Sequence, residues 1–378
     1  MIDVASQPDL LGITPVESSR DFKKFLQFPY KHYSGDQNWI APLHIQQKHL
    51  VDRKRNPFYK RAEAEFFIAH RGDEVVGRIA AINNKAYNEY NNTNIGFFGF
   101  FECVDSQFVA DLLFKIARDW ARNKGLNTIL GPTNPGMMDE IGILVDGFDK
   151  KPSIMMPYSK PYYDRLLKGA GFEKAMDLFA YSADKNTIKL ERFDRAGEIV
   201  MKRLPGLTIR PVNMRRFKTE VEIIHELFNK AWAKNWGFHE ISKEEFEDLG
   251  KELKMILDVD FAHIAEVDGK PIGFSIALPN INQALEHLDG SLLPTGIFKL
   301  WYHKRYINQI RTALMGIIPE YQGRGIDAML HRKAIENGLK KGYVSSEFGW
   351  LLETNTHIIR VAERLGGSLE KTYRLYQQ

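Results

Sequence analysis

The feature that most constrains the fold is an internal repeat, in which landmarks of the first half recur at a fixed distance in the second. Pro15 recurs as Pro211, 196 residues further along, and Ile68-Ala69 recurs as Ile264-Ala265 at the same distance. Single matches arise by chance, but a register kept from the start of each half to its end indicates duplication. The chain of 378 residues is long enough for two ordinary domains, so we expect two copies of one fold.

The distance between equivalent landmarks changes within the copies, and this change locates two insertions. The helix ending at Gly125 corresponds to one ending at Gly342, 217 residues further on. The second copy therefore carries an extra segment before that helix, roughly residues 282–306. The first copy restores the register with its own extra segment, roughly residues 132–158. A segment rich in Lys, Arg and Glu, residues 185–203, is the expected connection between the copies.

Periodicity and turn signals in the second copy predict the element order β-α-α-β-β-β-α-β-α-β. Ser242 followed by Glu245 is a capping box at a helix start, and Asp268-Gly269 is a strong signal for a two-residue hairpin turn. This order implies a mixed, mostly antiparallel sheet flanked by helices. We therefore expect an α/β protein of the α+β type with two tandem domains, at residues 1–190 and 200–378.

The composition is typical of a globular protein and argues against several classes. Lys and Arg number 52 against 48 Asp and Glu, a surplus too small to predict a nucleic-acid partner. Cys103 is the single cysteine and has no partner for an intramolecular disulfide, so we expect a cytoplasmic protein. We expect the Cys103 side chain to be a small buried hydrophobe rather than a nucleophile. No apolar stretch reaches the roughly 18 residues of a membrane span, and Met1 to Leu11 lacks the basic residues of a secretory signal.

The segment with most chemical content contains a strand, a turn that reads Gln322-Gly-Arg-Gly325, and the start of a helix. Glycines allow a tight turn that brings successive N–H groups toward one point, and the helix N-terminus adds partial positive charge. This combination suits a phosphate or pyrophosphate. A bare Gly-x-Gly also serves simple strand-to-helix connections, so the assignment depends on the surrounding elements.

The same turn formally matches the dinucleotide fingerprint G-x-G-x-x-G/A, with Glu347 at a plausible distance for a ribose contact. Two observations disfavour that alternative. Residues 319–322 separate the strand from the glycines, and only 50 residues follow Ala328, too few for the remaining strands of a doubly wound sheet. The chain contains no H-E-x-x-H or C-x-x-C motif, so no metal is expected.

The order of strand, Gln322-Gly-Arg-Gly325 turn, helix, strand, Asn355, helix, Gly-Gly and final strand resembles the GNAT superfamily of acyl-CoA-dependent N-acyltransferases, in a tandem-domain form. The superfamily signature is Q/R-x-x-G-x-G/A. The resemblance covers residues 207–378 and extends more weakly to residues 12–183. It implies transfer of an acyl group, with acetyl as the first expectation, from acetyl-CoA or another acyl-CoA to a small-molecule or peptide amine. The C-terminal domain would be catalytic and the N-terminal domain a degenerate support.

The resemblance also implies which residues hold the coenzyme. The strand would offer backbone groups to the pantetheine arm, the turn would hold the pyrophosphate, and an N–H near Ile318 would stabilise the thioester oxyanion. The expected coenzyme-binding residues are Ile317, Ile318, Gln322, Gly323, Arg324, Gly325, Ile326, Asp327 and Asn355.

The chain departs from the family pattern at three positions. Asp327 stands where the family has Gly or Ala, Ala362 where a Tyr often protonates the leaving thiolate, and Arg311 where some members carry a Glu as base. The substitutes that the sequence offers are Glu347 as a base and Tyr373 as a phenol donor. Two alternatives therefore stay open: a ligand-binding protein that has kept the fold without the chemistry, and a Fem-like aminoacyltransferase.

The first copy has no glycine turn, since its strand runs through Cys103 to Ser106, an ordinary helix N-cap. Its insertion has the flexible, aromatic character of a binding loop, although an ordered surface excursion explains it equally well. The basic runs at residues 53–55 and 303–305 are expected to be solvated faces rather than docking sites.

Overall fold

In the computed structural model, which describes residues 11–378 apart from the side chain of Ala196, the chain forms two compact units. Unit 1 consists of residues 11–152, Met156–Asp177 and Tyr373–Gln378. Unit 2 consists of Ser153–Met155 and Leu178–Thr372. The start of the chain, where the sequence predicted no secretory signal, lies outside the described residues up to Leu10.

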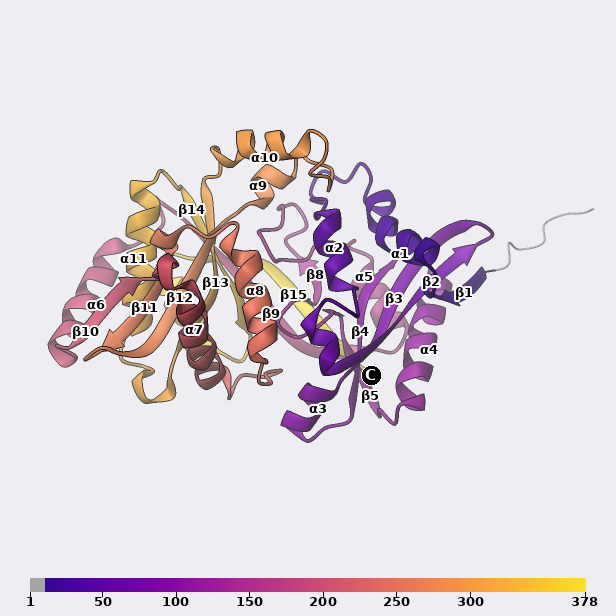
Figure 1. Ribbon diagram of the computed structural model, residues 1–378, viewed down its shortest axis with the longest axis horizontal. Helices are drawn as coiled ribbons and strands as arrows, with labels where there is room; N and C mark the ends of the chain where they lie inside the picture. The colour runs from indigo at the N-terminus through magenta and orange to yellow at the C-terminus, as the bar shows by residue number, and fades with distance from the viewer. Residues whose placement is uncertain (1–10) are drawn as a thin grey trace, which may run out of the picture. The chain divides into compact units, whose positions relative to one another are not determined.

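Unit 1 contains a mostly antiparallel sheet with helices, drawn in indigo to magenta in Figure 1. Strands β1 to β4 pair antiparallel in sequence order, and β4 pairs parallel with β5. Its elements are β1 (Leu11–Pro15), α1 (Ser19–His32), α2 (His44–Leu50), η1 (Pro57–Lys60), β2 (Ala62–Arg71), β3 (Glu74–Asn84), α3 (Lys85–Asn91), β4 (Ile95–Cys103), α4 (Gln107–Asn123), β5 (Thr128–Gly131), β6 (Thr133–Asn134), β7 (Glu140–Ile141), β8 (Ile143–Asp146) and α5 (Tyr163–Gly169).

Unit 2 repeats this order. Strands β10 to β13 pair antiparallel and β13 pairs parallel with β14. Its elements are the end of β9 (Glu173–Asp184), α6 (Leu190–Arg203), β10 (Leu207–Pro211), η2 (Met214–Arg216), α7 (Phe217–Trp232), α8 (Lys243–Lys254), η3 (Val259–Phe261), β11 (Ala262–Val267), β12 (Lys270–Pro279), α9 (Asn282–Leu285), α10 (Gly296–Lys304), β13 (Gln309–Ile317), η4 (Pro319–Tyr321), α11 (Ile326–Lys340), β14 (Ser345–Leu352), α12 (Thr356–Arg364) and the start of β15 (Ser368–Gln377).

Local signals account for the ends of these elements. The Ser242 hydroxyl accepts a hydrogen bond from the Glu245 N–H at 3.2 Å, and the Glu245 carboxylate accepts one from the Ser242 N–H at 3.0 Å, which completes the capping box of α8. Asp268 and Gly269 both have positive φ, 51° and 76°, as a two-residue hairpin turn requires. The predicted α/β fold class, with a mostly antiparallel sheet flanked by helices, is confirmed.

The ends of two strands differ from the domain boundaries that the sequence suggested. The end of β9 belongs to unit 2, where Asp184 pairs with Ser345 of β14. The end of β15 belongs to unit 1, where Tyr376 pairs with Gly131 of β5. The repeat in the sequence does not reveal which strand end belongs to which unit, because β9 and β15 are the last strands of their copies and are equivalent in the repeat.

Candidate functional site

Strands β13 and β14 of unit 2 pair over only part of their length. Four residue pairs join them, from Gln309–Ser345 to Thr312–Phe348, and the pairing ends there. Beyond this point β13 continues to Ile317 alongside β12, while β14 continues alongside β9. The strands therefore part, and β14 pairs with no residue of β13 from Ala313 onward.

The backbone groups that face this opening follow from the alternation of the strand. The Ile318 N–H donates to the Ile272 oxygen at 3.0 Å, so the polar groups of Ile318 are directed toward β12. The alternating residues, Met315 and Ile317, are directed the other way. Their carbonyl oxygens accept hydrogen bonds from side chains, Met315 from Trp232 Nε1 and Ile317 from Gln322 Nε2, both at 2.9 Å. The N–H groups on the open edge are therefore those of Met315 and Ile317. The predicted N–H of Ile318 is instead paired with β12.

The turn after β13 adopts the conformation that its glycines permit. Gly323 has φ +71° and Gly325 has φ +84°, a region that residues with a Cβ rarely occupy. Gly325 is also the N-cap of α11, whose first N–H groups lack partners within the helix. The exposed Arg324 holds its guanidinium 5.1 Å from the centre of the Tyr321 ring. The N–H groups at the start of α11 and the Arg324 guanidinium therefore come directly after the open edge of β13 in the chain.

The remaining predicted coenzyme residues have mainly local roles in this structure. Ile326 is buried beneath the start of α11. Asp327 lies in the first turn of that helix, where the helix dipole favours a carboxylate. The Asn355 side chain caps α12 by accepting a hydrogen bond from the Ile358 N–H at 3.4 Å.

A buried charged cluster lies where the two strands part. Glu347 of β14 is fully buried, with its Oε1 3.7 Å from Arg311 Nε and its Oε2 3.4 Å from Lys371 Nζ. Arg311 donates to the Gly349 oxygen at 2.8 Å and to the Ile154 oxygen at 2.9 Å. Gly349 is the first residue of β14 beyond the parallel pairing, so the guanidinium binds a carbonyl that the ladder no longer pairs. We call the point where β13 and β14 part, after Thr312 and Phe348, the fork. The charged cluster stabilises this fork.

The two predicted catalytic residues belong to different units, and both side chains are fully buried. Glu347 is enclosed by its two cations in unit 2 and is closed to substrate. Tyr373 belongs to unit 1, and its side chain is fully buried there. A positioning role at the point where β13 and β14 part suits Glu347.

In unit 1 the equivalent strand edge is filled by the insertion of that copy. Strands β4 and β5 pair over three residue pairs, from Ile95–Thr128 to Phe97–Leu130. Beyond them, the Phe100 N–H donates to Asn134 Oδ1 at 2.6 Å. A Cβ added at Gly99 would lie 1.7 Å from the Thr133 oxygen. The start of the insertion is thus an ordered plug, whereas β13 of unit 2 has no paired strand among the described residues on its β14 side from Ala313 onward.

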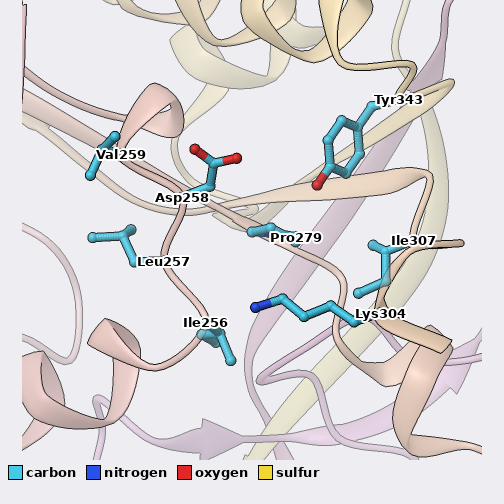
Figure 2. Close-up of a pocket in the computed structure, with 8 residues that line it drawn as sticks. All are labelled: Ile256, Leu257, Asp258, Val259, Pro279, Lys304, Ile307 and Tyr343. Atoms are coloured by element: carbon cyan, nitrogen blue, oxygen red, sulfur yellow. The ribbon is translucent and has the colours of Figure 1, made fainter. Parts of the chain in front are cut away.

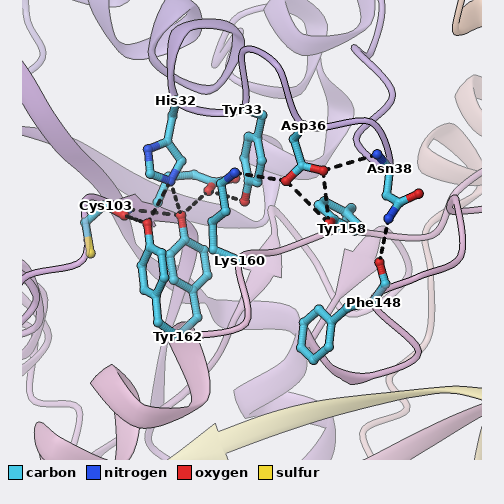
Figure 3. Close-up of polar contacts among 11 residues, drawn as sticks. His32, Tyr33, Asp36, Asn38, Cys103, Phe148, Tyr158, Lys160 and Tyr162 are labelled. Atoms are coloured by element: carbon cyan, nitrogen blue, oxygen red, sulfur yellow. Dashed lines mark hydrogen bonds and ion pairs between the residues drawn. The ribbon is translucent and has the colours of Figure 1, made fainter.

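Sequence reasoning missed a half-buried polar network in unit 1 (Figure 3). His32 Nε2 lies 3.0 Å from the Tyr163 hydroxyl and 3.2 Å from that of Tyr162. The Tyr163 hydroxyl donates to Glu102 at 2.6 Å, and so does Tyr33 at 2.7 Å. Burial lowers the pKa of His32 to about 4 and raises that of Glu102. No local pattern in the sequence marks this network, because 130 residues separate His32 from Tyr162.

The same network encloses the single cysteine. The Tyr162 hydroxyl donates to the Cys103 oxygen at 2.9 Å, and the Cys103 N–H donates to the Tyr163 hydroxyl at 3.2 Å. The Cys103 side chain is fully buried, and this burial raises the pKa of its thiol. A thiol kept protonated and enclosed is a core residue rather than a nucleophile.

A separate cavity of about 380 Å³ lies at the opposite end of β13 and β14 from the glycine turn (Figure 2). Ile307 and Tyr343, which precede these strands, line it together with Ile256, Leu257, Asp258, Val259, Pro279 and Lys304. The nine residues of β13 span about 25 to 30 Å at about 3.3 Å per residue, so the cavity is distinct from the turn.

Comparisons with known proteins identify the family, although no protein-family model matches the chain. The chain is 34% identical to the bacterial ceramide synthase of Caulobacter vibrioides, over 97% of each chain. It is also 34% identical to protein YghO of Escherichia coli, over 96% of this chain and 93% of that one. Among solved structures, a tandem GNAT protein from the clavulanic acid biosynthesis pathway matches 98% of each chain with a TM-score of 0.56 at 11% identity. No helix within residues 11–378 is long and apolar enough to cross a membrane. The chain therefore belongs to the family of the Caulobacter ceramide synthase and YghO, and it has the fold of a tandem GNAT protein.

Proposed function

We propose that this protein is an acyltransferase that moves an acyl group from an acyl-CoA to an amine, with the donor bound on the open edge of β13 in unit 2. The observation that carries the proposal is the continuity of that edge with the glycine turn and the α11 N-terminus. The edge presents backbone N–H groups in a line, and the turn ends that line with a site suited to a pyrophosphate. The corresponding edge of unit 1 is filled, which supports one donor site per chain.

Each part of the site has a proposed role. The N–H groups of Met315 and Ile317 would hydrogen-bond the pantetheine arm and the thioester oxygen, whose negative charge grows during attack. The N–H groups from Gly323 to Asp327 would hold the pyrophosphate, and Arg324 would add one charge-assisted contact. Glu347, held by Arg311, would keep the fork between the strands in place.

The proposed reaction is direct transfer. The amine nitrogen attacks the thioester carbonyl carbon, forms the C–N bond and expels the CoA thiolate as the C–S bond breaks. The proton lost by the amine passes to water, and the thiolate takes up a proton from water. In this scheme the protein contributes mainly orientation of the two reactants and stabilisation of the oxyanion.

The family relationship favours long chains over acetyl. One relative is named a bacterial ceramide synthase, and a ceramide is the N-acyl derivative of a long-chain amino alcohol. We therefore propose a fatty acyl-CoA as donor and a long-chain amine as acceptor.

The test is a single-turnover assay of free thiol and amide with acetyl-, hexanoyl- and palmitoyl-CoA, with and without sphinganine. We expect amine-dependent thiol release, greatest with the long chains, and its loss in Gly325→Trp. Gly197→Ala is the matched control, because a Cβ at Gly197 meets nothing within 4 Å. Binding of the thioester without amine-dependent release would identify a ligand-binding protein and refute the proposed activity.

A further inference from the structure

The insertion of the second copy carries an exposed apolar surface. Large side chains there are open to solvent, among them Leu293 at 77%, Phe298 at 72% and Trp301 at 75% exposure. We define the α10 patch as Leu293, Ile297, Phe298, Trp301, Tyr302 and Tyr306. Contiguous exposed surface of this kind marks an interaction site more often than single exposed residues do.

The helix is oriented so that this patch faces outward. The His303 ring stacks on His287 at 3.7 Å between centroids, and Lys299 Nζ donates to the His287 oxygen at 3.3 Å. A Cβ at Gly296 would lie 1.9 Å from the Ser291 oxygen, so the start of α10 packs closely on the preceding loop. The helix is thereby held on one side, and the α10 patch is left on the other. Figure 1 shows α9 and α10, in orange, beyond the ends of the strands of the same unit.

The charged side chains within residues 291–306 are all basic, while Glu286, which lies 3.5 Å from His287, is on the side that holds the helix. Residues 291–306 contain no Asp or Glu but contain Lys299, Lys304 and Arg305. The Arg305 guanidinium lies 4.4 Å from the Tyr302 ring centre and 5.3 Å from that of Trp301. The sequence predicted a solvated face at residues 303–305, and the structure adds that the neighbouring aromatic side chains Trp301, Tyr302 and Tyr306 are exposed as well.

We propose that the α10 patch docks this protein on the surface of an anionic lipid bilayer. Trp and Tyr favour the boundary between headgroups and acyl chains, and Lys and Arg are attracted to anionic headgroups. A short helix with an apolar, aromatic face and basic residues at its margin fits a position in the plane of that boundary. The basic residues of segment 291–306 favour an anionic lipid surface over a second copy of this chain, whose patch would carry the same charge. The inference is independent of the proposed acyl transfer, although docking would bring such an enzyme to amines dissolved in the bilayer.

Sedimentation of the full chain with vesicles tests the proposal, with vesicles of phosphatidylcholine alone and with 30 mol% phosphatidylglycerol. We expect binding to the anionic vesicles, weaker binding to neutral ones, and a loss of at least about tenfold in the partition coefficient for Phe298→Ser with Trp301→Ser. Lys304→Gln and Arg305→Gln should each lower binding about fivefold on anionic vesicles only. Phe108→Ser is the matched control, because Phe108 is 64% exposed on α4 and lies outside the patch.

A second measurement separates docking from catalysis and from folding. Thiol release with a short, water-soluble amine should be the same in the double variant as in the wild type. Failure of the wild type to sediment with anionic vesicles, or equal sedimentation of the double variant, would overturn the proposal. Self-association in sedimentation velocity that disappears with Phe298→Ser would assign the patch to a second copy and overturn it as well.

Discussion

Replacing Gly325 with alanine tests the geometry of the turn at the start of α11. The φ of +84° disfavours any residue with a Cβ by about 1–2 kcal/mol. The new Cβ would also lie 2.9 Å from Cγ2 of Val200 on α6, and overpacking of this kind costs about 1–3 kcal/mol. We therefore expect Gly325→Ala to lower the free energy of unfolding by about 2–5 kcal/mol. Gly323→Ala is the matched control, because φ is +71° and nothing lies within 4 Å of its Cβ, so only the backbone contribution remains.

The assay is urea unfolding of the full chain, with both glycine variants made in the wild-type and Val200→Ala backgrounds. Val200→Ala removes the Cγ2 atom that the new Cβ would meet. In that background the loss of unfolding free energy in Gly325→Ala should be about as small as in Gly323→Ala. The coupling free energy between positions 200 and 325 then measures the contact itself. Equal effects of the two glycine variants in the wild type, or a coupling near zero, would refute the reasoning.

Three further predictions address the buried charges, the pH dependence and the plug. Glu347→Gln removes the buried carboxylate between Arg311 and Lys371, of which Lys371 keeps Glu370 at 3.7 Å, and should cost about 3–5 kcal/mol in urea unfolding. Asp119→Asn in an exposed pair should change the free energy of unfolding little. Burial holds the pKa of His263 near 4 against an ordinary 6.5, so the unfolded chain binds the proton first. Stability should fall by on the order of 3 kcal/mol as the pH drops from 6.5 to 4, and an unchanged slope in His263→Gln would contradict this assignment. Gly99→Ala should cost about 3 kcal/mol or more in thermal unfolding, because its Cβ meets the Thr133 backbone, whereas Gly197→Ala in α6 should add about 0.5–1 kcal/mol.

The sequence was sufficient where the determinants are local. The capping box at Ser242 and the Asp268-Gly269 turn depend on residues within four positions of one another, and both formed as predicted. The glycine turn formed where expected for the same reason, since its two glycines carry the required positive φ themselves.

The sequence was insufficient where residues far apart in the chain meet. Asn134 closes the strand edge at Phe100 across 34 residues, and no local pattern marks that contact. Glu347 was expected to be a base, but its burial between Arg311 and Lys371 depends on three strands that only the fold brings together. The exposure of Trp301 likewise required the structure, because an aromatic side chain in a short helix is ordinarily part of a core.

The central claim is that each chain binds one acyl-CoA, on the open β13 edge and the turn after it. Isothermal titration calorimetry with palmitoyl-CoA below its micellar concentration tests this claim most directly. We predict one site per chain, abolished in Gly325→Trp and retained in Gly197→Ala. Two sites per chain, or one site with unchanged affinity in Gly325→Trp while that variant stays folded, would contradict the account.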